Sequence, residues 1–379
     1  MSEYLKYLNK KSKVGLALFS ALSVILTSIE IFAVWCSVKI IEITSAVAKR
    51  DEVPLIDFPI LQDKLNSIQL SVQLALLASI TFFLFLIRSF AQVFVNKRIL
   101  LSLSRSAARI SIEGLKNTME RNTYMGDYKK LSQIEYLLTI GVDKAVLTMI
   151  GSAAILVSDI FLIFFTIIFL LAYDLATAIT LFLFGIISFT LANKLATSKL
   201  ENIGRKKTTV DIALSSQIKD IIRIAEEARN TQFFRTLINE IKNERFIQGE
   251  LYSLQTIFPY VSKYVIEFGF LLSAAILSSY KVLIGTIVDA ASALGLLFLG
   301  GSRLTPTLLR LQQSWQAIAG ATGPAEQALS ELKNSELLAK NIIKHDLTSS
   351  PHISVRNIGF GWNKEKFVFD NLNFNIYAN

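Results

Sequence analysis

The chain has 379 residues, of which 52% are hydrophobic and only 18% are charged, so it is more apolar and less charged than ordinary soluble domains. One cysteine and two histidines exclude a disulfide framework, a Cys/His zinc site and most histidine-dependent catalysis. The net charge of +9 at pH 7 fits either a nucleic-acid partner or the cytoplasmic margins of membrane helices. Composition therefore favours a membrane protein, with no metal site and no catalytic residue expected in this chain.

Six apolar runs, each close to the length of about 20 residues that crosses a bilayer, follow in chain order. Long polar connections separate the second run from the third and the fourth from the fifth, whereas only Asp174 separates the third from the fourth and only Tyr280 and Lys281 separate the fifth from the sixth. We expect an all-α membrane protein whose long connections and termini share one side. The expected spans are residues 14–38, 70–95, 146–173, 175–192, 259–279 and 282–301.

Lysine and arginine indicate which side is cytoplasmic. They are concentrated near the N-terminus and in both long connections, for example at Lys10, Arg98 and Lys194. On the opposite side the few basic residues are offset by Asp51 and Glu52. The positive-inside rule then places both termini in the cytoplasm and the chain in the inner (cytoplasmic) membrane of a cell. Because no basic stretch is interleaved with aromatics, no nucleic-acid partner is expected.

Both long connections have helical patterns. Residues 98–118 and 194–246 carry recurring apolar positions with almost no glycine or proline, so the spans are expected to continue as helices into the cytoplasm. Turn-forming residues around Gly126, and the stretch 224–234, predict a short break at the tip of each arm. Such arms suit docking to a cytoplasmic domain, and simple solvated extension is the alternative.

The C-terminal tail carries the first family resemblance. After an expected amphipathic helix over 324–344 and a Ser/Pro linker comes "HISVRNIGFGWNKEKFVFDNLNFNIYAN", whose alternating apolar residues predict short strands joined by "NKEK". This segment resembles the opening of an ABC-transporter nucleotide-binding domain. The resemblance implies that residues 1–345 form an ABC exporter transmembrane domain, and that 346–379 form a linker and the truncated start of a nucleotide-binding domain, a short β stub.

The same resemblance implies ATP and Mg as cofactors of the full-length transporter. Trp362 stands at the aromatic position that stacks on adenine in the family, with a buried strand aromatic as the alternative. The sequence contains no G-x-x-x-x-G-K-[ST] loop, whose backbone N–H groups and lysine cradle phosphates. A signature loop and a second acidic motif are also missing, so we expect no ATPase activity from this chain alone.

The resemblance further implies coupling helices at the two cytoplasmic breaks, a second subunit and alternating access. The fourth and fifth spans would cross to pack against that subunit, which makes a homodimer or a heterodimer. The residues that match the coupling helices are Tyr124, Met125, Gly126 and Asp127 at the first break, and Glu227, Arg229 and Asn230 at the second.

Ionisable residues inside spans are costly, so they mark functional sites. At 1.5 Å per residue, Arg88, Arg303 and Lys263 lie roughly 24–33 Å from the outer ends of their spans, near the cytoplasmic leaflet boundary. Arg310 shares the helix face of Arg303. These four residues are the predicted substrate-binding set, because a cationic belt suits phosphate oxygens. Snorkelling to the interface, or pairing within the bundle, is the alternative.

Two short motifs refine the substrate. The stretch "GGSRLTPTLLRLQQSW" (300–315) resembles the "F-R-L-x-P-S" segment of bacterial ABC flippases for lipid-linked oligosaccharides, although Ser302 and Thr307 depart from it. Arg88 in "FLIRSF" falls where that group places a membrane arginine. The resemblance implies an amphipathic substrate in membrane lipid, a polyprenyl-pyrophosphate-linked glycan, and a short external helix within 51–67.

Two other functions stay open at this stage. A peptide or drug exporter would use the same scaffold with an aromatic or acidic cavity. A regulatory or interaction membrane protein without a motor would belong to a different class.

Overall fold

The computed structural model describes residues 2–49, 69–119, 128–228, 232–339, 353–360 and 368–377. It divides into a helical unit that reaches Glu336 and a small unit from Leu337 onward. The sequence boundary expected at 345/346 lies in a stretch outside the described residues, as do the linker and the "NKEK" turn.

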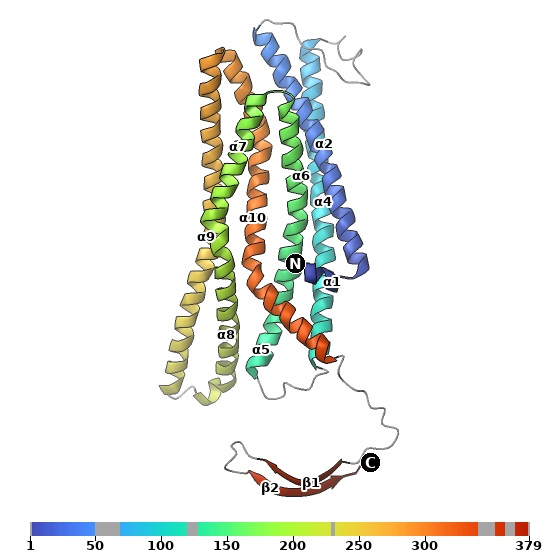
Figure 1. Cartoon of the computed structure of the whole chain (residues 1–379), viewed down its shortest axis with the longest axis vertical. Helices are drawn as coiled ribbons and strands as arrows, with labels where there is room; N and C mark the ends of the chain where they lie inside the picture. Colours follow the sequence, from blue (N-terminus) through green and yellow to red (C-terminus); the bar gives the residue numbers. More distant parts are fainter. Residues whose placement is uncertain are drawn as a thin grey trace. The chain divides into compact units, whose positions relative to one another are not determined.

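The helical unit is built from very long helices (Figure 1). Among the described residues, six of them are long and apolar enough to cross a membrane, which confirms the six-span prediction. The helices are α1 (Ser2–Tyr7), α2 (Lys10–Lys49), α4 (Leu70–Met119), α5 (Tyr128–Tyr136), α6 (Gly151–Leu171), α7 (Leu175–Ala192), α8 (Ser198–Ala228), α9 (Gln232–Ile284) and α10 (Ile287–Ala339), with π-helical turns at Leu137–Gly141, Lys144–Ile150 and Asn193–Thr197.

Several helices are much longer than a bilayer requires. At 1.5 Å per residue, the 50 residues of α4 extend roughly 75 Å, against a hydrocarbon core about 30 Å thick. The predicted helical arms beyond the membrane are therefore confirmed. The helices stop where breaks are expected, since α4 ends at Met119 before α5 begins at Tyr128, and α8 ends at Ala228 before α9 begins at Gln232.

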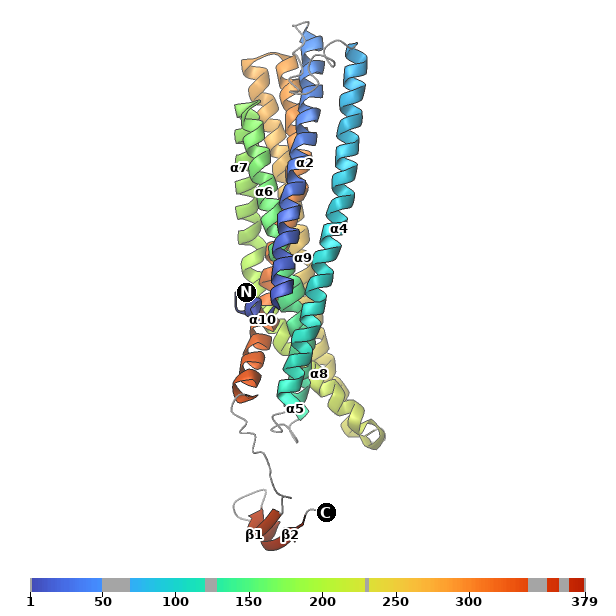
Figure 2. The same cartoon turned by 90° about the vertical axis from the view of Figure 1, so that its right-hand side faces the viewer.

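The two larger buried apolar clusters among the described residues hold the helices together. One joins α2, α4 and the segment around α5 and the first π-turns to the C-terminal half of α10, through residues such as Leu103, Val142 and Ala325. The other joins α6, α7, α9 and the membrane half of α10, through Leu181 and Leu297 among others. Helix α10 belongs to both clusters and therefore links the two halves of the bundle. Figure 2 shows α2 between α4 and α6, and it packs against both.

Helix α10 runs through two prolines. The sequence predicts that Pro324 begins a separate helix, but this prediction is wrong, because α10 continues through Pro306 and Pro324 to Ala339. Proline lacks the N–H that would bond the carbonyl four residues earlier, which bends a helix. Pro324 thus leaves the Gly320 carbonyl without that bond, and a Cβ added to Gly204 of α8 would lie only 2.5 Å from this oxygen. The α8–α10 crossing is therefore a direct backbone contact.

The N-terminal helix α1 is attached to the C-terminal half of α10. The hydroxyl of Tyr4 donates a hydrogen bond to the Ala325 carbonyl at 2.5 Å, and the side chain of Tyr4 is buried. Glu3 pairs with Lys333 at 2.6 Å. The first and last helices of this unit are thus joined to each other.

At the opposite end of the spans, Asp174 joins three helices. Its carboxylate caps α7 by accepting from the Thr177 N–H at 2.9 Å, and it accepts from the Lys281 ammonium of α9 at 2.8 Å. Partial burial opposes its charged form, but these hydrogen bonds outweigh burial, so the pKa of Asp174 lies below its ordinary value. The short α6–α7 connection is thereby tied to the end of α9.

The small unit contains a β-hairpin. Strands β1 (Ile353–Phe360) and β2 (Phe369–Ile376) pair antiparallel, with Val355 opposite Phe374. The register shifts between Val355 and Ile358, beside Asn357, whose φ of 57° is left-handed. The expected strands are confirmed.

Several predicted residues lie outside the described part of the chain. These are Trp362, the proposed external helix within 51–67, and the coupling-helix residues Tyr124, Met125, Gly126, Asp127, Arg229 and Asn230. Glu227 lies in the last turn of α8.

The backbone contact between α8 and α10 is testable by Gly204→Ala. We expect a loss of about 1–3 kcal/mol in stability, because the added methyl meets a carbonyl oxygen that cannot rotate away. Thermal unfolding of the purified protein in detergent measures it. Gly249→Ala is the matched control, since a Cβ there meets nothing within 4 Å and alanine is the better helix former. Equal unfolding temperatures for the two variants would contradict the close crossing.

Candidate functional site

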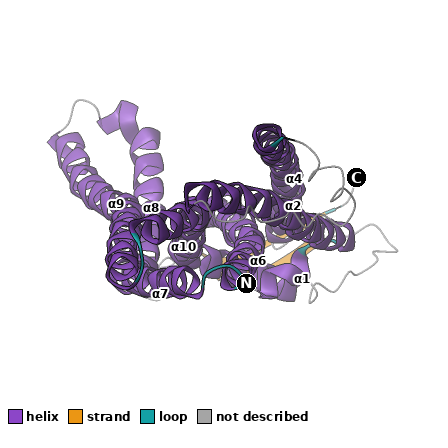
Figure 3. Cartoon of the chain, turned by 90° about the horizontal axis from the view of Figure 1, so that it is seen from above, coloured by secondary structure: helices purple, strands orange, loops and turns teal. Residues whose placement is uncertain are grey.

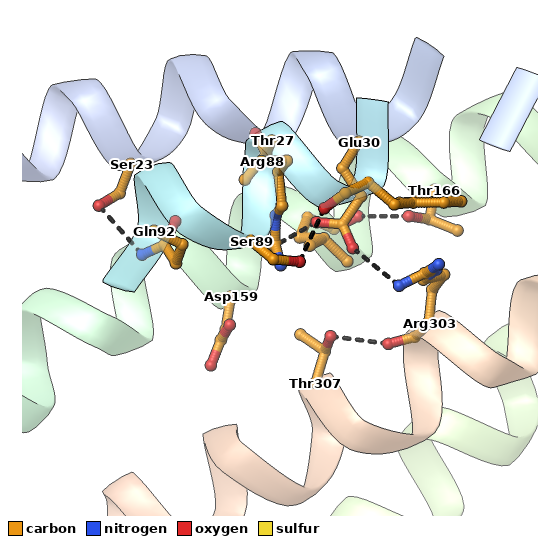
Figure 4. Close-up of polar contacts among 12 residues, drawn as sticks. Ser23, Thr27, Glu30, Arg88, Ser89, Gln92, Asp159, Thr166, Arg303 and Thr307 are labelled. Carbon is orange, nitrogen blue, oxygen red and sulfur yellow. Dashed lines mark hydrogen bonds and ion pairs between the residues drawn. The ribbon is translucent and has the colours of Figure 1, made fainter. Parts of the chain in front are cut away.

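Five charged side chains from four helices gather inside the helical unit. They are Glu30 on α2, Arg88 on α4, Asp159 on α6, and Arg303 and Arg310 on α10. We call this set the charge cluster. Figure 4 shows Glu30 between Arg88 and Arg303, with Asp159 nearby. The cluster lies among the apolar spans, where ionised groups are stable only when paired.

Glu30 is shared between two arginines. Its Oε2 lies 2.6 Å from Nη2 of Arg88, and its Oε1 lies 3.7 Å from Nη1 of Arg303, while only 5% of its side chain is exposed. The contact with Arg88 is an ion pair without hydrogen-bond alignment, because Oε2 has no aligned donor. The guanidinium of Arg303 also lies 3.7 Å from the ring centre of Phe85, a cation–π contact. Glu30 thus connects α2 with both α4 and α10.

Asp159 and Arg310 form a second ion pair. Nη2 and Nε of Arg310 donate to the two carboxylate oxygens of Asp159 at 2.9 and 3.4 Å. The same Nη2 lies 3.2 Å from the hydroxyl of Thr307. The side chain of Asp159 is 6% exposed and that of Arg310 is 44% exposed. The pair joins α6 to α10 in a forked geometry.

A cavity of about 150 Å³ opens onto the cluster. Two of the arginines, Arg88 and Arg310, line it together with Asp159. Its other polar lining residues are Ser23, Gln92, Asn96 and Ser158. Two polar atoms of that lining, Nε of Arg88 and Oε1 of Gln92, are buried without a hydrogen-bond partner. Such atoms are costly unless a ligand or water meets them, so the lining is suited to a polar ligand.

The predicted binding residues separate into two groups. Arg88, Arg303 and Arg310 come together around the two carboxylates. All three arginines therefore form ion pairs inside the bundle, which is the alternative role given for them from the sequence. Lys263 pairs with Glu267 on α9 at 3.7 Å, with both side chains nearly half exposed. It is not among the residues that line the described cavity.

Sequence reasoning missed the uncharged part of the site. Gln92 and Asn96 follow Arg88 at intervals of four residues, the spacing of one helix face, and all three line the cavity. That periodicity was available in the sequence as a signal. The contributions of Ser23 and Ser158 depend on how α2 and α6 pack, which no local pattern shows.

The charge cluster has a net positive formal charge of +1, because three guanidiniums face two carboxylates. In a low-dielectric interior this charge attracts an anion more strongly than it does in water. No described side chain offers a glycine-rich cradle for a nucleotide, and the full sequence contains no such loop. The residues that the structure describes therefore do not fit ATP.

Comparisons with known proteins define the fold. No protein-family model matches the chain, and no curated protein matches it. Among solved structures, the chain is similar to a bacterial Atm1-family ABC exporter with ATP bound, with a TM-score of 0.55 and 14% sequence identity. The similarity covers 97% of this chain and 61% of the exporter chain. The chain therefore has the fold of an ABC exporter transmembrane domain, and it spans about three fifths of that exporter.

The Asp159–Arg310 pair is testable by removing one partner. Arg310→Met leaves a buried carboxylate unpaired, and we expect a loss of about 1–3 kcal/mol in stability. Adding Asp159→Leu removes the orphaned charge, so the double variant should regain most of that loss. Thermal unfolding in detergent measures both. If the double variant were no more stable than Arg310→Met alone, the pair would not be the source of the effect.

Proposed function

We propose that this chain is the membrane domain of an ATP-driven transporter that moves an amphipathic substrate with an anionic head group by alternating access. The observation that carries the proposal is the cavity lined by Arg88 and Arg310, with Arg303 adjoining through Glu30. The exporter fold supports transport. The arginines support an anionic substrate, since they give the charge cluster beside the cavity a net formal charge of +1.

A pyrophosphate-linked lipid fits this chemistry. Forked guanidinium donors match the oxygens of phosphate groups. Because the exposed surfaces of the spans are apolar, a polyprenyl tail can stay in the lipid while the head group is bound. The flippase-like segments around Arg88 and Arg303 support a lipid-linked oligosaccharide as the substrate. Lys263, half exposed on α9, contacts the substrate at the edge of the pathway in this proposal.

The long arms serve to connect the membrane cavity to a motor. Helices α4, α8 and α9 extend as continuous rods from the spans to the breaks near Met119 and Ala228. The coupling segments proposed for these breaks, around Gly126 and from Glu227 to Asn230, would contact a nucleotide-binding domain. This chain's own contribution is to bind the substrate, keep the cavity apart from lipid and move α10 relative to α8.

A second subunit, most simply a second copy of this chain, completes the proposal. Helices α8 and α9 stand away from α2 and α4 (Figure 3). On α9 several large apolar side chains outside the expected span are exposed, including Phe246, Ile247 and Tyr252. Exposed apolar surface of this kind marks an interface. The orientation, with both termini and all arms in the cytoplasm, follows from the lysine and arginine distribution.

Substrate binding is testable by reconstituting the chain with its nucleotide-binding domain in proteoliposomes. Arg88→Ala and Arg303→Ala should each lower ATP-dependent flipping of a pyrophosphate-linked lipid by about tenfold or more, because each removes charge-assisted hydrogen bonds to the head group. Arg98→Ala is the matched control, since Arg98 lies on the same helix and is exposed. Unchanged flipping in both variants would reject the anion site. Stimulation of ATPase activity by peptides or drugs alone would favour an exporter of those compounds.

Orientation is testable by cysteine labelling in cells. The native Cys36 is 1% exposed and gives little background with a membrane-impermeant maleimide. Leu283→Cys at the outer end of α9, where the side chain is 84% exposed, should react in intact cells. Lys242→Cys on the α9 arm should react only after permeabilisation. The reverse pattern would place the arms outside.

A further inference from the structure

Charges of both signs line the cavity, and the negative one opposes the binding of an anion. Arg88 and Arg310 favour an anion, but the buried carboxylate of Asp159 lines the same cavity. An anionic ligand would therefore lie beside a like charge in a low-dielectric region, which is strongly unfavourable. Either the ligand's charge or that of Asp159 must change for tight binding.

Glu30 does not repel an anion in the cavity in the way that Asp159 does. It is not a lining residue of the cavity, and it faces two cations, Arg88 at 2.6 Å and Arg303 at 3.7 Å. When a ligand draws the Arg88 guanidinium into the cavity, Arg303 still neutralises Glu30. The shared pair thus allows Arg88 to change partners without leaving a bare carboxylate on α2.

Among the described residues, Arg310 alone forms an ion pair with Asp159. Both of its oxygens face Arg310, through Nη2 at 2.9 Å and Nε at 3.4 Å. A ligand phosphate that takes these donors leaves Asp159 buried, unpaired and next to a negative charge. A carboxylate in that position is neutralised by binding a proton. The charged groups that act on it are Arg310 on α10, Arg88 on α4 and Glu30 on α2.

The net charge of the charge cluster determines how many protons are taken up with each ligand. Its formal charge of +1 is cancelled by a phosphodiester, which carries one negative charge, but not by a diphosphate diester, which carries two. Resting on the function proposed above, we propose that this cavity binds a diphosphate diester together with one proton, which Asp159 takes from solvent to become a neutral carboxylic acid. Substrate loading is thereby coupled to proton uptake.

Isothermal titration calorimetry on the complete transporter in nanodiscs tests this coupling. The probe is a farnesyl diphosphate diester of N-acetylglucosamine, whose own charge stays constant between about pH 6 and about pH 8. Titrations in two buffers of different ionisation enthalpy count the protons taken up. The matched ligand is the corresponding monophosphate diester, which has the same lipid and sugar. The matched control variant is Glu42→Gln, which removes a carboxylate from an ion pair with Lys39 elsewhere on α2.

The wild type and Glu42→Gln should take up close to one proton with the diphosphate probe and fewer with the monophosphate. Affinity for the diphosphate should fall by up to about tenfold per pH unit as pH rises. Asp159→Asn should bind it with no proton uptake and no such pH dependence, and more tightly than wild type near pH 8. If Asp159→Asn does not fold, the wild-type proton count decides alone.

Diphosphate binding without proton uptake would overturn the coupling and leave the proposed function standing. Absence of any binding, or binding unaffected by Arg88→Ala and Arg303→Ala together, would overturn the anion site and the coupling with it.

Discussion

A carboxylate among apolar spans is stable only where cations face it, and this requirement fixes how the helices of the bundle meet. Glu30 needs Arg88 and Arg303, so α2 is held against α4 and α10. Asp159 needs Arg310, so α6 is held against the same helix. Apolar packing is weakly specific between helices surrounded by lipid, because lipid tails are as apolar as the side chains they replace. The charge pairs therefore fix the positions of the helices along one another, which apolar contacts alone do not determine. They do so at the level of the cavity.

Helix α10 is the element on which both halves of the unit depend. It enters both buried clusters, carries two of the three cluster arginines, and crosses α8 through glycine backbones at Gly204 and Gly320. Pro324 frees the carbonyl at that crossing. A contact between backbones has no interlocking side chains to resist sliding, so the crossing suits a pivot. Movement of the C-terminal half of α10 about this point would change the surroundings of Arg303 and Arg310.

Much of this architecture follows from local sequence patterns. Long apolar runs predict the six spans, helical periodicity predicts the arms, and alternation predicts the hairpin of β1 and β2. The choice of Arg88, Arg303 and Arg310 also follows, since an arginine inside a span is conspicuous. What could not be predicted is which carboxylates they pair with, because Glu30 and Arg303 lie far apart in the chain and meet only after α2 and α10 pack. The prediction that a separate helix begins at Pro324 was wrong for a related reason. In the sequence, a proline that starts a helix cannot be distinguished from one that bends it until the neighbouring backbone is known.

The junction of α1 with α10 has a consequence for biosynthesis. Tyr4 donates to Ala325, and Glu3 pairs with Lys333, so these residues bind partners that are made more than three hundred positions later. These contacts cannot form while the ribosome is still inserting the earlier spans. Helix α1 must remain undocked until α10 has emerged. Its docking is then a late step in assembly, completed only by chains in which α10 has been inserted.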